Sequence, residues 1–267
     1  MTGSGAMDDS DAARQEMDEI EAAKRILACL DLTDLSDDST AERVEALCDR
    51  ARSPHGPVAA VCVWPRFVAT ARAALGQGPV RVATVVNFPG GDAPAGDVLD
   101  EVEAAIAAGA DEIDLVVPWK GLIEGDDEPV RALVERVRAA AGAPVKAILE
   151  TGMLNTEALI RRAAQLAIAG GADFLKTSTG KVPVNATLRA AEILLDEIAR
   201  ADRPVGFKAA GGIRTLDDAR GYLDLACARF GPDWALPASF RIGASGLYDA
   251  LIATLDGAEV PRIAGGY

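Results

Sequence analysis

The sequence is poor in the residues on which many catalytic sites depend. It holds a single histidine, His55, and four cysteines among 267 residues. One imidazole excludes a zinc site built on several histidines, and a Ser-His-Asp triad would have to use His55 itself. The cysteines form no C-x-x-C pair, which argues against a cysteine-rich metal site and fits a reducing compartment. The chemistry is therefore expected to use lysine, carboxylate, hydroxyl and backbone groups, with no metal and no cofactor.

Long uncharged runs and an excess of basic residues are also missing. The longest stretch without Asp, Glu, Lys or Arg is Ser53–Pro65, which is shorter than the roughly 18 apolar residues that span a bilayer. The net charge is −14, and nucleic acid or an anionic membrane would favour a basic face, so neither is an expected partner. The N-terminus lacks the basic-then-apolar pattern of a secretory signal. A cytoplasmic protein is predicted.

The chain reads as a polar, acidic extension followed by one domain. Residues 1–12 are rich in Gly, Ser, Asp and Ala and are predicted to be disordered, and the domain covers residues 13–267, beginning with a helix near Ala13. Beyond that helix, short apolar runs alternate with longer segments of helical periodicity. The predicted strands are Ile26–Leu30, Val58–Val63, Val80–Val86, Glu112–Val117, Val145–Leu149, Asp173–Thr177, Val205–Lys208 and Phe240–Gly243. The predicted helices are Thr40–Arg52, Pro65–Leu75, Ala95–Ala108, Pro129–Ala141, Thr156–Ala169, Ala186–Ala201, Leu216–Phe230 and Leu247–Leu255.

This strict alternation predicts an α/β fold with a parallel sheet and helices outside it. Eight strand–helix units in a chain of this length fit a single-domain (β/α)₈ TIM barrel with an N-terminal helical extension. A doubly wound open sheet is the alternative. It usually needs fewer strands, and the sequence contains neither the G-x-G-x-x-G fingerprint nor a Walker loop.

Three of the six lysines fall inside predicted strands. Lys146, Lys176 and Lys208 lie in the fifth, sixth and seventh strands, although lysine is depleted in strands and almost never fully buried without a partner. A desolvated lysine beside another cation can become a neutral amine near pH 7 and attack a carbonyl, so the cluster indicates Schiff-base chemistry. The alternative is that each lysine reaches solvent or pairs with a carboxylate such as Asp114.

Two glycine-rich turns follow the last two predicted strands. Gly211 and Gly212 come after the seventh strand, and Gly243–Gly246 ends the eighth. Barrels of this type bind phosphate after strands seven and eight, where glycine exposes backbone N–H groups beside a helix N-terminus. Ordinary turn glycines are the alternative, but their occurrence after two consecutive strands favours a phosphate site.

Six segments of the sequence carry a family signature. They are Asp31–Leu35, Val85–Pro89, Glu112–Pro118, Lys146–Gly152, Ala172–Lys181 and Gly206–Arg214. In this order they resemble the motifs of the deoxyribose-phosphate aldolase family, and the segment on the sixth strand is the most specific. The resemblance implies a class I aldolase on a (β/α)₈ barrel. Its expected activity is the reversible cleavage of 2-deoxy-D-ribose 5-phosphate to acetaldehyde and D-glyceraldehyde 3-phosphate.

The resemblance also assigns roles to individual residues. It implies that Lys176 is the Schiff-base nucleophile and that Lys208 is the neighbouring cation that lowers its pKa, which agrees with the argument from the strand lysines. Asp114 would relay protons with Lys208 through water, and Lys146 would help to order Asp114. The terminal Tyr267 matches family members with a mobile tyrosine tail that serves proton exchange at the enamine carbon. An idle terminal aromatic is the alternative.

The same resemblance implies a set of substrate contacts. Asp31 and Thr33 would contact the substrate hydroxyls, although Thr33 could equally be a helix-cap or turn residue. Lys181 would supply positive charge to the phosphate, while the other contacts supply N–H or hydroxyl groups. The remaining expected substrate-binding residues are Thr179, Gly180, Gly211, Gly212, Gly243 and Ser245.

Two other functions stay open at this point. One is a different enzyme on the same scaffold, such as a phosphosugar isomerase or a lyase that uses another keto donor. The other is a non-catalytic phosphosugar-binding or regulatory protein, which would keep only the anion site. The expected partners are small phosphosugars and aldehydes, and a homodimer is among the oligomeric states that the sequence leaves open.

Overall fold

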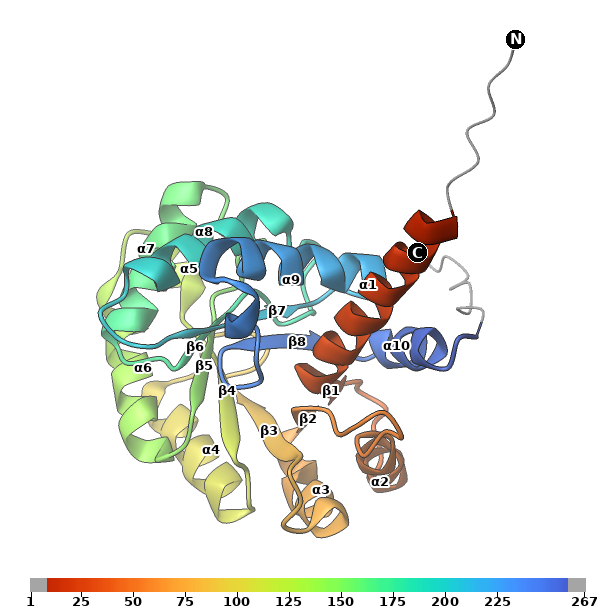
Figure 1. The fold of residues 1–267 in the computed structure, drawn as a ribbon. Helices are drawn as coiled ribbons and strands as arrows, with labels where there is room; N and C mark the ends of the chain where they lie inside the picture. Colours follow the sequence, from red (N-terminus) through yellow and green to blue (C-terminus); the bar gives the residue numbers. More distant parts are fainter. Residues whose placement is uncertain (1–8, 259–267) are drawn as a thin grey trace.

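The Val-, Ile- and Leu-rich runs of the sequence pair in chain order into a closed barrel of eight parallel strands (Figure 1). The structure is a computed structural model and describes residues 9–258. Its strands are β1 (Leu30–Asp34), β2 (Ala60–Val63), β3 (Arg81–Val86), β4 (Glu112–Val116), β5 (Val145–Ile148), β6 (Phe174–Lys176), β7 (Gly206–Ala210) and β8 (Phe240–Ala244). β8 pairs with β1 and closes the barrel, so the predicted fold class is confirmed.

Helices follow the strands and cover the outside of the barrel (Figure 1). They are α1 (Asp9–Ala28), α2 (Ala41–Arg50), α3 (Val68–Leu75), α4 (Ala95–Ala107), α5 (Trp119–Ile123), α6 (Glu128–Ala141), α7 (Glu157–Ala169), α8 (Leu188–Arg200), α9 (Leu216–Phe230) and α10 (Leu247–Leu255), with the 3₁₀ turns η1 (Pro65–Phe67) and η2 (Pro232–Trp234). The N-terminal α1 packs against α9 and α10. Of these elements, α5 and η2 had no counterpart in the prediction, and η1 forms the first turn of the predicted helix Pro65–Leu75.

Threonine caps fix where several helices begin. Thr40, Thr156, Thr187 and Thr215 precede α2, α7, α8 and α9, and each hydroxyl accepts a hydrogen bond from a backbone N–H in the first turn. Such caps satisfy donors that the helix leaves unpaired, so they anchor both the helix and the loop that enters it. These loops lie at the C-terminal end of the strands, where a TIM barrel carries its site.

The apolar side chains form two separate cores. The larger one lies between the barrel and its helices. The smaller one lies inside the barrel, where Ala60 and Cys62 of β2 pack with Ala83 and Val85 of β3. Seven charged side chains occupy the other strands and are each at most 5% exposed: Asp31, Glu112, Asp114, Lys146, Lys176, Lys208 and Arg241. Barrel interiors are usually filled by branched apolar residues, whereas most strands of this barrel place charged side chains in the interior.

The predicted first strand, Ile26–Leu30, is wrong. α1 continues to Ala28, because Ile26 and Leu27 extend the helical spacing of buried residues in that helix. The actual strand, β1, runs from Leu30 to Asp34. Its polar residues interrupt the apolar pattern by which strands are predicted from sequence. Asp31 is nevertheless fully buried, since its carboxylate belongs to the ionic interior.

The N-terminal boundary also differs from the prediction. α1 begins at Asp9 and not near Ala13, so it includes residues 9–12, which were predicted to be disordered. The helix α1 packs on α9 and α10 further along its length. That packing stabilises the whole helix, so its polar first turn can also be helical. The rest of the predicted disordered extension lies outside the described residues.

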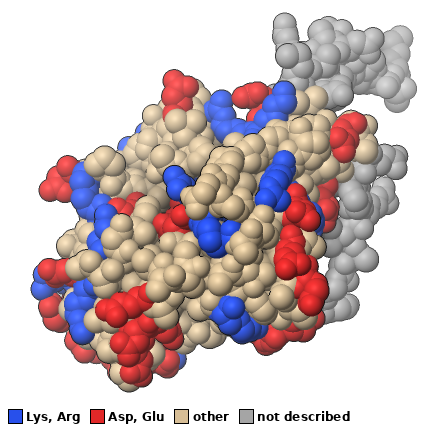
Figure 2. Space-filling model, turned by 90° about the horizontal axis from the view of Figure 1, so that it is seen from below, with Lys and Arg blue, Asp and Glu red and all other residues tan. Residues whose placement is uncertain are grey.

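The surface is charged but mixed. Acidic and basic side chains are interspersed on the face shown in Figure 2, and acidic side chains gather toward its margins. Many of the surface arginines form ion pairs, such as Arg131 with Glu128 and Arg189 with Glu157. Among the described helices, none is both long and apolar enough to cross a membrane.

Candidate active site

Three lysines from neighbouring strands converge on one carboxylate. Lys176 Nζ lies 2.6 Å and Lys208 Nζ 2.8 Å from Asp114 Oδ2, and Lys146 Nζ lies 2.8 Å from Asp114 Oδ1. The strand register accounts for this, since Lys176 is level with Lys208 and Asp114 is level with Lys146. Each lysine pairs with Asp114, as the alternative interpretation expected, and the lysines still form the single cluster that the sequence indicated.

A second set of ion pairs lies beneath these groups. Asp31 Oδ2 is 2.5 Å from Lys208 Nζ, and Asp31 Oδ1 accepts a hydrogen bond of 2.6 Å from Arg241. Glu112 is bound by Lys146 at 2.6 Å and by the other guanidinium nitrogen of Arg241 at 2.7 Å. Buried ions are tolerated when paired and hydrogen-bonded in this way. The lysine cluster is therefore the upper part of a larger network.

The network shifts the pKa values of Lys176 and Lys208 in opposite directions. Burial lowers the pKa of Lys176, and the neighbouring Lys208 adds to this effect, while Asp114 opposes it. Burial also opposes the charge of Lys208, but the carboxylates of Asp114 and Asp31 outweigh it and raise the pKa of Lys208. Lys208 has two carboxylate partners where Lys176 has one, so Lys208 holds its proton more firmly.

The carboxylates of the network are held in their charged form. Burial raises the pKa of Asp114, but Lys146, Lys176 and Lys208 together hold it well below the usual range. Burial acts in the same sense on Asp31, and Lys208 and Arg241 reverse it, so the pKa of Asp31 is also lowered. An ionised Asp114 can accept a proton from a neighbouring group, while protonated Lys208 can donate one.

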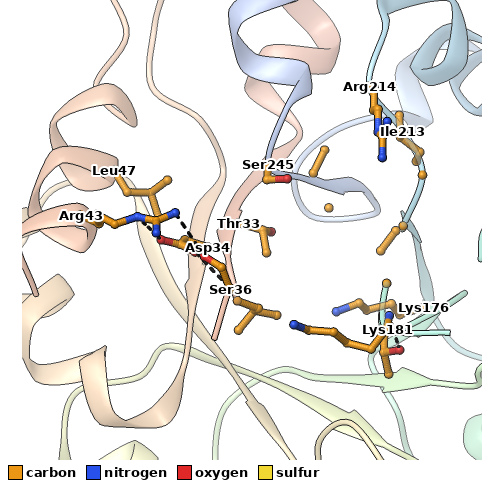
Figure 3. Close-up of a pocket in the computed structure, with 18 of the residues that line it drawn as sticks. Thr33, Asp34, Ser36, Arg43, Leu47, Lys176, Lys181, Ile213, Arg214 and Ser245 are labelled. Carbon is orange, nitrogen blue, oxygen red and sulfur yellow. Dashed lines mark hydrogen bonds and ion pairs between the residues drawn. The ribbon is translucent and has the colours of Figure 1, made fainter. Parts of the chain in front are cut away.

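A pocket of about 720 Å³ opens above the network at the C-terminal end of the barrel. Lys176 is the one member of the lysine cluster that lines it. In Figure 3, Lys176 and Lys181 point into the pocket from one side, and Arg43 and Asp34 lie on the opposite side. The predicted substrate-binding residues that line it are Thr33, Thr179, Gly180, Lys181, Gly211, Gly212, Gly243 and Ser245. The buried amine therefore meets the expected phosphate contacts in one cavity.

The glycines of the pocket are required by geometry. Gly211 and Gly212 have φ values of 90° and 83°, a region that other residues rarely adopt. A Cβ atom at Gly243 would lie 2.9 Å from Lys208 Cε, so a side chain there would displace the lysine that supports the site. Gly211 and Gly212 thus allow the turn after β7, and Gly243 allows close approach of β8 to the ionic network.

One basic side chain of the pocket, Arg214, was not among the site residues predicted from the sequence. Arg214 follows the Gly211–Gly212 pair, is exposed, and lines the pocket, into which it points in Figure 3. Its backbone N–H donates to Asp218, part of the capping box with Thr215 that begins α9. The Thr-x-x-Asp signal directly after the arginine could have indicated that Arg214 lies at a helix start beside the glycine turn.

A second missed residue, Glu150, holds the loop after β6. Its carboxylate accepts hydrogen bonds from the backbone N–H of Thr179 at 3.1 Å and from the Thr179 hydroxyl at 2.6 Å. The same hydroxyl accepts the backbone N–H of Lys181 at 3.0 Å. Glu150 is fully buried at a φ of 54°, and burial raises its pKa. It connects the end of β5 to the pocket loop without lining the pocket itself.

The remaining predicted site residues fall in different places. Thr33 lines the pocket, with its hydroxyl donating to the backbone oxygen of Asp31 at 2.8 Å. Asp31 is fully buried, does not line the pocket and pairs with Lys208, which differs from the expected direct contact with substrate. Tyr267 lies outside the described residues, so its role in proton exchange stays a prediction.

Comparison with known proteins identifies the family. The model of the DeoC/LacD family aldolases matches residues 25–231. The chain belongs to this aldolase family. A deoxyribose-phosphate aldolase from Agrobacterium fabrum is 53% identical over 250 residues, which cover 92% of this chain and 96% of that relative. The similarity to this relative therefore extends over nearly the whole chain.

Solved structures agree with this assignment. A protein from Toxoplasma gondii ME49 assigned as a deoxyribose-phosphate aldolase has a TM-score of 0.83 at 26% identity, covering 91% of this chain and 99% of its own. The tetrameric deoxyribose phosphate aldolase of Aeropyrum pernix has a TM-score of 0.69 at 26% identity, covering 94% and 98%. The aldolase described here is therefore a member of the deoxyribose-phosphate aldolases, as its motifs suggested.

Proposed function

We propose that this aldolase reversibly cleaves 2-deoxy-D-ribose 5-phosphate to acetaldehyde and D-glyceraldehyde 3-phosphate through a Schiff base on Lys176. The observation that carries the proposal is the buried Lys176 amine, which lines the pocket and has a lowered pKa. An uncharged amine is the nucleophile that attack on an aldehyde carbon requires. The glycine turns, Lys181 and Arg214 line the same pocket and support binding of the phosphate there.

The reaction begins on the open-chain sugar. Lys176 Nζ adds to the C1 carbonyl, and the nitrogen passes one proton to the new hydroxyl to give a carbinolamine. Loss of water, with a proton delivered by the Asp114–Lys208 pair, forms the protonated imine. These two groups share a hydrogen bond of 2.8 Å and both lie beside Lys176, so they can exchange protons at this nitrogen.

The bond between C2 and C3 then breaks. A base removes the proton of the C3 hydroxyl, the C2–C3 electron pair moves toward the iminium nitrogen, and D-glyceraldehyde 3-phosphate leaves. The enamine that stays on Lys176 is protonated at C2, and water hydrolyses the resulting imine to release acetaldehyde. Asp114 is the proposed proton acceptor, acting through water, and Lys146 orders it through its 2.8 Å hydrogen bond. The proposed donor to C2 is Tyr267.

The experiment is a trapping reaction with a coupled assay. Acetaldehyde and borohydride should reduce the imine and leave an ethyl group on Lys176, which peptide mapping locates. Cleavage of 2-deoxyribose 5-phosphate should proceed with no added metal and in the presence of a chelator, because no step uses one. Turnover without an adduct on Lys176, or loss of activity with the chelator, would contradict the mechanism.

The cytoplasmic location and the homodimer stay predictions.

A further inference from the structure

The ion pair between Glu112 and Arg241 has no role in the reaction described above. Both side chains are buried, and the two guanidinium nitrogens lie 2.7 and 3.1 Å from the Glu112 oxygens. The pair is at the base of a hollow of about 990 Å³ at the N-terminal end of the barrel. It therefore lies at the opposite end of the barrel interior from the substrate pocket.

Two routes of direct contacts join this pair to the lysine cluster. Arg241 binds Asp31 at 2.6 Å, and Asp31 binds Lys208 at 2.5 Å. Glu112 binds Lys146 at 2.6 Å, and Lys146 binds Asp114 at 2.8 Å. Both routes end on groups that touch Asp114, the partner of Lys176. A change of charge at Arg241 is thus felt through a continuous buried network, where screening by water is weak.

The charges of the interior balance without Lys176. Three carboxylates, Asp31, Glu112 and Asp114, face three other cations. Those cations are Lys146, Lys208 and Arg241. A protonated Lys176 would be a fourth positive charge with no fourth carboxylate in direct contact.

We propose that Arg241 is a positioning residue of the reaction, which completes the neutralisation of the three buried carboxylates and so leaves the Lys176 amine uncharged. Arginine suits this place, because it keeps its charge at every pH of interest and binds two carboxylates with a planar fork. Without Arg241, three carboxylates would share two cations, and a proton on Lys176 would restore the balance. The proposal rests on the proposed Schiff base.

The other titratable groups around Lys176 come from most of the barrel strands. They are Asp31 on β1, Cys62 on β2, Asp114 on β4, Lys146 on β5, Glu150 after β5 and Lys208 on β7, with Lys181 in the same pocket. Cys62 is buried, and burial raises its pKa, so it stays a neutral thiol. Among the network cations, Arg241 is the one whose charge no proton transfer can remove.

The test uses the pH dependence of kcat/KM for four proteins: the wild type, Arg241→Met, Glu112→Gln and the double variant. The acid limb of this profile reports the ionisation of the free-enzyme amine. Arg241→Met should move that limb to higher pH by on the order of half to one unit, because the interior gains negative charge. Glu112→Gln should move it to lower pH. The double variant restores the charge balance and should return to the wild-type profile.

Two measurements separate this role from a merely structural one. The KM for 2-deoxyribose 5-phosphate should stay within about twofold in the variants, since neither residue lines the pocket. Arg241→Lys retains the charge and should keep the wild-type acid limb near neutral pH. An equal loss of rate at every pH in the single variants, with no shift of the limb, would overturn the proposal.

The outcome stays decisive if a single variant fails to fold. The double variant carries no uncompensated charge, and an acid limb displaced from that of the wild type would then overturn the proposal. Trapping of acetaldehyde on wild-type Lys176 checks the Schiff base separately. Absence of the wild-type adduct would remove the proposed function, whereas a normal adduct with an invariant acid limb removes only the role of Arg241.

Discussion

Lys176 and Lys208 are register partners on β6 and β7, and their Nζ atoms lie 2.6 and 2.8 Å from the same atom, Asp114 Oδ2. If both lysines were protonated, one carboxylate oxygen could not fully neutralise the two charges. Lys208 has Asp31 as a second partner, so Lys176 is the lysine that gives up its proton more readily. This asymmetry between two adjacent lysines underlies the first two predictions.

Replacement of Lys176 by arginine should abolish turnover. A guanidinium cannot lose its proton and cannot form the imine. The coupled cleavage assay measures the loss, and borohydride trapping should leave no adduct. Lys120→Arg is the matched control, because Lys120 pairs with Asp92 on the surface and should retain full activity. Residual turnover by Lys176→Arg above the background without enzyme would refute the assignment.

Replacement of Lys208 by leucine should slow cleavage at neutral pH by on the order of 10² or more. The pH–rate profile should also move toward alkaline pH. The removed cation is one that lowers the pKa of Lys176, so the amine would keep its proton to higher pH and be less nucleophilic at neutral pH. Lys208→Arg, which keeps the charge, should shift the profile less. A wild-type rate at pH 7 in Lys208→Leu would contradict the role.

Acid should destabilise the protein through its buried carboxylates. The pKa values of Asp31, Glu112 and Asp114 are lowered in the folded state, despite burial, by the surrounding lysines and Arg241. Their stabilisation is therefore complete above the unfolded-state values of 3.8 and 4.5 and is lost as the pH falls below them. Calorimetric Tm should thus drop steeply below about pH 4.5.

Asp114→Asn provides the control for this acid effect. The variant should be less stable at pH 7 by about 3–5 kcal/mol, because the substitution leaves buried cations without their partner. It should also lose less Tm than the wild type between pH 5 and pH 3, since one of the linked protonations is gone. An equal fall in Tm between pH 5 and pH 3 in the two proteins would show that folding does not lower the pKa of Asp114.

Arg214→Ala should weaken binding of the substrate phosphate. Arg214 lines the pocket beside the glycine turn, and a hydrogen bond to a charged group contributes about 1.5–3 kcal/mol. The KM for 2-deoxyribose 5-phosphate should rise roughly 10- to 100-fold, while cleavage of unphosphorylated 2-deoxyribose should hardly change. Arg189→Ala, on the outer face of α8, is the control. An equal effect on both substrates would show that Arg214 does not contact phosphate.

Glu150→Ala should loosen the pocket loop that carries Thr179 and Lys181. The substitution leaves the buried N–H of Thr179 without its acceptor, at a cost of about 1–3 kcal/mol. Hydrogen exchange over residues 178–181 should accelerate, and the KM for the phosphorylated substrate should rise more than kcat falls. Glu157→Ala on the exposed start of α7 is the comparison variant. Unchanged exchange in that loop would contradict the bracing role of Glu150.

The boundaries of most elements could be predicted from apolar periodicity, and the first strand could not. In β1 the inward residues Asp31 and Thr33 are polar, and an alternation rule that expects apolar inward residues cannot find such a strand. The same rule extended the strand prediction into Ile26, whose neighbours already followed a helical spacing. Residues that serve the ionic interior break the patterns that mark ordinary strands.

The local sequence determined the alternation of strands and helices, the glycine turns and the three lysines that end up in neighbouring strands. Periodicity and glycine placement act over a few residues, so they can be read without the fold. The tertiary structure alone decided which charges meet. Arg241 and Asp31 are 210 residues apart in the chain, and only closure of β8 onto β1 brings them into contact. Because a pKa depends on burial and on such distant partners, the lowering of the pKa of Lys176 and the raising of that of Lys208 require the closed barrel.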